Sequence, residues 1–142
     1  MRIFLSYVAA DQAWARQLAS QMSKAGLQVV DRYTSTLPGE NPYLAVGKAL
    51  QESDGIVFLF SPDLLASDQL AGELEYALGD SRFEGRMVGV LLRGAKADEA
   101  PWIMRHLRFL EDGGSPTEVA RRLEGRLLKS REAGGSKAHA TS

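Results

Sequence analysis

The chain has 142 residues, of which 44% are hydrophobic and 25% are charged, and its formal net charge is -1. These values are typical of one globular domain and give no reason to expect nucleic acid or an anionic membrane as a partner. The absence of cysteine excludes disulfides and thiol chemistry, and two histidines are too few to suggest a histidine-rich metal site, so no metal is expected. No apolar run approaches the roughly 18 residues of a membrane-spanning helix, and the apolar stretch at the N-terminus is too short for a signal peptide. We therefore expect the protein in the cytoplasm.

The first quarter of the chain predicts a strand, a helix and a second strand. Ile3–Tyr7 is an apolar run, and Asp11 is expected to cap a helix that continues through Ala25. Gly26 is expected to end that helix, and Leu27–Val30 forms the second strand. The apolar face of the helix is expected to contain Trp14, Leu18, Met22 and Ala25.

The middle of the chain predicts a loop, a helix, a strand and another helix. Residues 31–41 read as the loop, and Pro42 suits the first turn of the helix that follows. Gly55–Phe60 is apolar throughout, as expected for a strand covered on both faces. The next helix carries Glu73. The inner faces of the two helices are expected to contain Tyr43, Val46, Gly47 and Leu50, and Leu70, Leu74, Ala77 and Leu78.

The last third of the chain is less regular. Met87–Leu92 is predicted as the fourth strand, residues 94–105 as an irregular segment and Leu107–Leu110 as a short fifth strand. Pro116 opens a final helix, whose apolar face would contain Val119, Leu123 and Leu127. Beyond residue 130 the composition is that of a disordered tail or a linker, so the predicted domain spans residues 1–130 and the tail residues 131–142.

Alternating strands and helices predict a flavodoxin-like α/β fold, a doubly wound parallel sheet of about five strands with helices on both faces. In the common order 2-1-3-4-5, ligands bind at the switch point between the carboxyl ends of strands one and three. Ser6 and Tyr7, Ser61 and the loop after strand two would lie there. Glu73 follows shortly after strand three, so the fold analogy directs attention to it.

Glu73 has two possible interpretations. At about 100° per residue it is expected roughly 85° from the centre of the apolar stripe, at the edge of the buried face, while Glu75 points further into solvent. Most glutamates in such positions are solvated surface carboxylates. A glutamate beside a ligand crevice can instead take part in catalysis.

Four segments resemble motifs of the Toll/interleukin-1 receptor (TIR) domain family, of the bacterial type. They occur in the family's order and extend from residue 2 to about residue 92. The matching segments are Phe4-Leu5-Ser6-Tyr7 with Asp11, Asp31 with Leu37-Pro38-Gly39, Ala49-Leu50-Gln51-Glu52-Ser53, and Ser61 to Ser67 with Glu73-Leu74. The family contains scaffolds that bind other TIR domains, and enzymes that cleave NAD⁺ into nicotinamide and ADP-ribose or a cyclic isomer.

For the enzymatic class, the resemblance implies that Glu73 is the catalytic residue, that NAD⁺ is a substrate with no cofactor needed, and that the protein acts in bacterial defence or toxicity signalling. One carboxylate suffices chemically, because nicotinamide in NAD⁺ is already cationic and leaves as a neutral molecule without a general acid. The carboxylate has only to orient the ribose and offset the charge of its oxocarbenium-like transition state. The resemblance also implies a homo-oligomer, because the family builds its site partly from a neighbour's loop, here Leu37, Pro38 and Gly39.

The other candidate substrate-binding residues each have a structural alternative. Ser6 and Tyr7 could serve only strand-end hydrogen bonding and packing, and Arg32 could meet a pyrophosphate or simply be solvated. Tyr43 could stack on a base or pack in the core, and Ser61 and Ser67 could cap helices. Tyr33 and Gln69 complete the set of candidate substrate-binding residues.

Two other functions compete with NAD⁺ cleavage. The first is a non-catalytic TIR–TIR interaction module, favoured by Gln69 where many relatives carry Trp and by Val8-Ala9 where many carry a basic residue. The second is a response-regulator-like domain, which would need a phosphoacceptor Asp where this chain has Ser61. That requirement ranks it last.

Overall fold

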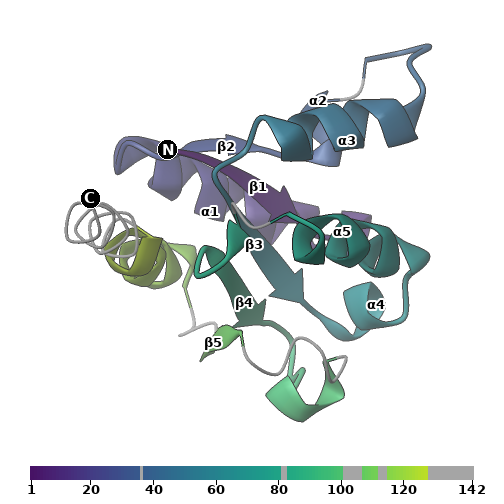
Figure 1. The fold of residues 1–142 in the computed structure, drawn as a ribbon. Coiled ribbons are helices and arrows are strands. Elements are labelled where there is room, and N and C mark those ends of the chain that lie inside the picture. Colours follow the sequence, from purple (N-terminus) through teal and green to yellow (C-terminus); the bar gives the residue numbers. More distant parts are fainter. Residues whose placement is uncertain (36, 81–82, 101–106, 112–114, 128–142) are drawn as a thin grey trace, which may run out of the picture.

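Five parallel strands form one sheet in the computed structural model, which describes residues 1–35, 37–80, 83–100, 107–111 and 115–127. The order is β2-β1-β3-β4-β5, which confirms the predicted fold (Figure 1). The strands are β1 (Arg2–Ser6), β2 (Gln28–Val30), β3 (Gly55–Phe60), β4 (Met87–Leu91) and β5 (Arg108–Glu111). Because the order reverses at β1, the carboxyl ends of β1 and β3 meet at the topological switch point.

The predicted long helices are all present; three of them connect strands, and the fourth follows the last strand. They are α1 (Gln12–Lys24), α3 (Pro42–Gln51), α5 (Asp68–Leu78) and a C-terminal helix that is described over residues 116–127. In Figure 1, α3 and α5 lie in front of the sheet and α1 lies behind it. No helix in the described part of the chain has both the length and the apolar character required to cross a membrane.

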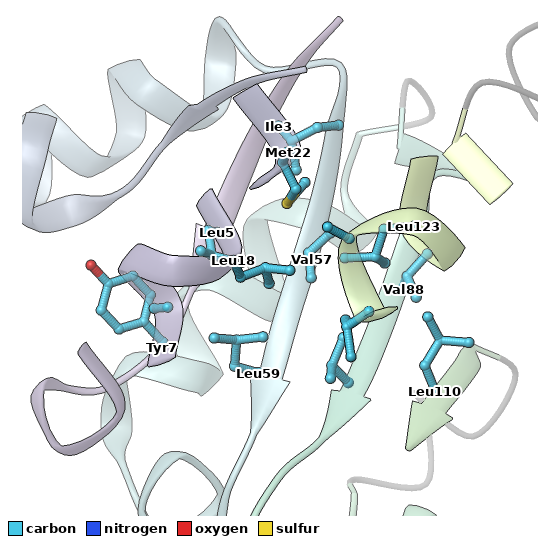
Figure 2. Packing of buried hydrophobic residues seen from close by; sticks show 14 of the residues in the cluster. Ile3, Leu5, Tyr7, Leu18, Met22, Val57, Leu59, Val88, Leu110 and Leu123 are labelled. Atoms are coloured by element: carbon cyan, nitrogen blue, oxygen red, sulfur yellow. The ribbon is translucent and has the colours of Figure 1, made fainter. Parts of the chain in front are cut away.

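The core has two halves, one on each face of the sheet. Successive side chains of a strand point to opposite faces, so Ile3 and Leu5 pack with α1 and the C-terminal helix, while Phe4 packs with α3 and α5. Figure 2 shows the first half, where Leu18, Met22 and Leu123 surround the strands. Ser6 points to the same face of the sheet as Phe4, and Tyr7 points to the same face as Leu5. Consecutive residues therefore serve opposite sides of the sheet.

Four short elements were not predicted. They are η1 (Ala9–Asp11), α2 (Arg32–Ser35), α4 (Pro62–Leu65) and η3 (Ala97–Glu99). Residues 31–41 are thus not a plain loop, and the run from Ser61 to Leu74 holds two helices. Each of these elements has three or four residues, too few to show a helical period in the sequence.

Two predictions about the helices need correction. Asp11 occupies the N-cap position of α1, as predicted, but its side chain makes no capping bond, and its carboxylate instead pairs with Arg93 at 2.9 Å. That ion pair joins the segment after β1 to the segment after β4. Leu78 is not part of the inner face of α5, because it is the last residue of the helix and is 45% exposed.

The element boundaries otherwise agree with prediction to within one residue. Leu27, Leu92 and Leu107 lie just outside strands, and Ala25 is the residue after the end of α1. Gly26 has φ +90°, as expected for a residue that ends a helix. The proposed tail, residues 131–142, lies outside the described residues.

Candidate functional site

Glu73 is buried, not at the edge of the protein core. Its side chain is 1% exposed, while Glu75 on the same helix is exposed as predicted. The buried arc of α5 consists of Leu70, Glu73, Leu74 and Ala77. Because Leu78 is excluded, the centre of this arc moves toward Glu73. The predicted angle was measured from a stripe that wrongly included Leu78, which explains the error.

Two partners from distant parts of the chain hold the Glu73 carboxylate. Ser6, at the end of β1, donates its hydroxyl hydrogen bond to Oε2, and Nη2 of Arg32, in α2, lies 3.0 Å from Oε1. A buried carboxylate is costly unless hydrogen bonds or an opposite charge compensate its lost hydration. Ser6 supplies a hydrogen bond, and Arg32 supplies the opposite charge. The structure therefore brings three of the predicted site residues together at the switch point of the sheet.

Asp31 fixes the segment that carries Arg32, and the sequence analysis did not select it as a site residue. Its Oδ1 accepts hydrogen bonds from the backbone N–H groups of Tyr33 and Thr34, each at 2.8 Å, and its Oδ2 accepts one from the hydroxyl of Tyr7 at 2.7 Å. The first two bonds start α2 at Arg32. An Asp directly before Arg-Tyr-Thr-Ser was a usable capping signal in the sequence.

Tyr7 and Tyr33 form an aromatic pair next to this cap. Their ring centroids are 5.2 Å apart with an interplanar angle of 35°. Tyr7 is 2% exposed and Tyr33 38%. Burial raises the pKa of both phenols above the ordinary value, and for Tyr7 the hydrogen bond to Asp31 raises the pKa further. Tyr7 therefore has a structural role in supporting Asp31, and Tyr33 presents the accessible ring.

Two other predicted site residues, Ser61 and Ser67, have described side chains that make contacts away from the Glu73 cluster. The hydroxyl of Ser61 accepts the Leu64 N–H at 3.3 Å and caps α4, as one of its two interpretations predicted. The hydroxyl of Ser67 donates to the Leu64 carbonyl at 2.8 Å and does not cap α5. The side chains of Tyr43 and Gln69 lie outside the described part, although their backbones belong to α3 and α5.

The predicted association loop is an exposed turn between α2 and α3. The Glu40 N–H donates to the Leu37 carbonyl at 3.0 Å, and the Leu37 N–H donates to Oε1 of Glu40 at 3.1 Å. Gly39 has φ +86°, a backbone conformation that favours glycine. Leu37 is 63% exposed, so the turn presents a large apolar side chain to solvent.

The remaining features of the surface do not compete with this cluster. A hollow of about 300 Å³ lies between α1 and the C-terminal helix, on the opposite side of the sheet from α5. It is lined by Arg16, Gln17, Ser20, Gln21, Pro116 and Thr117. Within the described ranges, no group of three or more His, Asp or Glu residues could hold a metal ion.

Comparison with known proteins agrees with this fold. A family model described as TIR domain matches residues 3–124. The TIR domain of the Toll-related receptor TRR-2 from Hydra magnipapillata has a similar structure, with a TM-score of 0.69 and 18% identity over 91% of this chain and 97% of that one. At this identity the likeness concerns the fold alone.

A metazoan TIR-STING receptor from C. gigas is similar in two structures. The first has a TM-score of 0.72 and 26% identity over 88% of this chain. The second, in complex with 2',3'-cGAMP, has a TM-score of 0.71 and 28% identity over 86% of this chain. This chain spans only 39% and 38% of those two receptor chains. The comparison with curated proteins finds no match.

Proposed function

The chain belongs to the TIR domain family, and on that premise we propose that it cleaves NAD⁺ at the nicotinamide–ribose bond, with Glu73 as the catalytic carboxylate. One observation carries this proposal. Glu73 is a buried acid at the switch point of the sheet, held by a serine hydroxyl and an arginine. Strongly desolvated carboxylates with specific partners are enriched at functional sites.

The proposed reaction breaks the bond between C1′ of the ribose and the pyridinium nitrogen, and the bonding electrons leave with neutral nicotinamide. Positive charge develops on the ribose, where the Glu73 carboxylate offsets it and accepts hydrogen bonds from the ribose hydroxyls. Water then adds to C1′ and loses a proton, which gives ADP-ribose. A nitrogen of the adenine adding instead of water would give a cyclic isomer.

The test is release of nicotinamide from NAD⁺ by concentrated or artificially oligomerised protein, measured by chromatography. We expect Glu73→Gln to reduce the rate about 100-fold or more, because the amide keeps the shape of the side chain but removes its charge. Glu75→Gln is the matched control, since Glu75 is an exposed glutamate of the same helix. Equal rates for wild type and Glu73→Gln would exclude the proposed role.

A second candidate function is a non-catalytic TIR–TIR interaction module. The exposed Leu37 turn favours it, because a large apolar side chain presented on a turn suits contact with another protein. This alternative predicts association without NAD⁺ loss at any oligomeric state. Products from the wild type in the same chromatographic assay would exclude it. We place either activity in defence or toxicity signalling.

A further inference from the structure

Arg32 covers the carboxylate that the proposed reaction needs. Its Nη2 lies 3.0 Å from Oε1 of Glu73, and the two side chains are 31% and 1% exposed. Ser6, which holds Oε2, is completely buried. Of these two partners, Arg32 is therefore the one in contact with solvent. A ribose approaching Glu73 from solvent would meet the guanidinium first.

The contact between Arg32 and Glu73 leaves the guanidinium incompletely satisfied. Within the described residues, the buried Nε of Arg32 has no hydrogen-bond partner. Guanidinium groups bind best to pairs of oxygens that accept two parallel hydrogen bonds, as carboxylates and phosphates can provide. A ligand with two neighbouring anionic oxygens could occupy both Nε and Nη2. Such a ligand would compete with Glu73 for Arg32.

The backbone below Arg32 is held by hydrogen bonds, whereas its side chain is held by the ion pair with Glu73 and is 31% exposed. Asp31 caps α2, and Tyr7 holds Asp31 from the other face of the sheet. The carboxylate of Asp31 is thus engaged with its own helix and with Tyr7. Breaking the contact between Arg32 and Glu73 would therefore require rotation of the Arg32 side chain and not movement of the capped backbone of α2.

We propose that Arg32 is a substrate-displaced latch: the diphosphate of the substrate takes the guanidinium from Glu73, and the freed carboxylate then receives the ribose. This inference rests on the proposed function and adds a determinant of specificity. The free protein is closed at Glu73, and only a substrate that carries an anionic group opens it efficiently. Nicotinamide riboside contains the same scissile bond without a phosphate, so it displaces Arg32 from Glu73 only inefficiently.

The first test compares NAD⁺ with nicotinamide riboside as substrates of the oligomerised protein. We expect wild type to prefer NAD⁺ and Arg32→Ala to reduce the ratio of the two kcat/KM values about tenfold or more. KM for NAD⁺ should rise, and kcat/KM for nicotinamide riboside should also rise because Glu73 is no longer covered. Arg32→Lys should retain part of the preference. An unchanged or lower kcat/KM for nicotinamide riboside in Arg32→Ala would overturn the latch.

A second test does not depend on activity and uses inorganic pyrophosphate as the probe in isothermal titration calorimetry. Glu73→Gln should bind pyrophosphate about tenfold more tightly than wild type, a coupling of ordinary size between sites. The gain should vanish when Arg32→Ala is added, whereas Arg121→Ala, on the C-terminal helix, should leave it intact. Equal affinity of wild type and Glu73→Gln would reject the latch. If wild type released no nicotinamide from either substrate, the proposed function would fail, and this titration would still decide the latch.

Discussion

At the scale of single residues, burial distinguishes Glu73 from the other acids of the chain. Glu73 and Glu75 lie two positions apart on one helix, yet one is buried and the other exposed. The helical angle separated the two, but it placed Glu73 at the edge of the buried face and not inside it, because the true buried arc depends on where α5 meets the sheet. The family resemblance selected Glu73, and the fold supplied the reason: Ser6 and Arg32 compensate its lost hydration.

Tyr7 gives a prediction about pH, because its raised pKa makes it a source of stability that disappears in alkali. Below the ordinary pKa of 10.0 the phenol is protonated in both states and its contribution is complete. As the pH rises further, the unfolded chain ionises first, and the free energy of unfolding falls by up to about 1.4 kcal/mol per pH unit.

Tyr7→Phe tests this linkage. At about pH 8 we expect it to lower the free energy of unfolding by about 1–3 kcal/mol, because Asp31 loses a hydrogen-bond donor while buried. Above about pH 10 the difference in the free energy of unfolding between wild type and Tyr7→Phe should shrink. The reason is that wild type loses the stabilisation by the Tyr7 phenol at high pH, whereas the variant has no phenol at this position. Urea unfolding at both pH values is the measurement. Tyr33→Phe is the control at the lower pH, and a difference independent of pH would contradict the assignment.

At the scale of elements, the strands are the best-predicted parts of the chain and the short helices the worst. All five strands were found, and the signal was clearest for the inner strands β1, β3 and β4, whose apolar residues the parallel sheet buries. Helix α2 was missed because a hydrogen-bonded cap, and not an apolar stripe, defines it. Four residues cannot form a stable helix alone, so α2 depends on Asp31 and, through it, on Tyr7.

The strand β4 contains a position where only glycine fits. A Cβ added at Gly89 would lie 2.7 Å from the rings of both Phe60 and Phe109. We therefore expect Gly89→Ala to lower the free energy of unfolding by about 1–3 kcal/mol through overpacking. Gly72→Ala, at an exposed position of α5 where a Cβ meets nothing within 4 Å, should instead raise it by about 0.5–1 kcal/mol. Urea midpoints of the two variants that shift in the same direction would refute this account.

At the scale of the whole molecule, the turn with Leu37 is an exposed apolar feature that one chain does not explain. Its side chain is 63% exposed. Large apolar side chains on a turn gain stability by burial against another chain. We expect Leu37→Ser to weaken self-association and, with it, NAD⁺ cleavage, while changing the free energy of unfolding by less than about 0.5 kcal/mol.

Sedimentation velocity over a range of concentrations measures that association. Leu78→Ser provides the matched control, because Leu78 is also an exposed leucine but lies at the end of α5. Unchanged association in Leu37→Ser would remove the turn from the interface. Association lost without any change in NAD⁺ cleavage would separate assembly from catalysis.

The sequence by itself determined the class of fold, the order of the strands and the family, and it selected Glu73 as the candidate acid, because hydrophobic periodicity and short motifs are local properties of a chain. Only the tertiary structure decided how that acid is held. The contacts of Glu73 with Ser6 and Arg32 join residues 67 and 41 positions apart. Asp31, which caps α2, receives its hydrogen bond from Tyr7 only when the segment after β1 lies beside it. Burial and ion pairing arise where distant segments contact each other, and local sequence patterns do not predict such contacts.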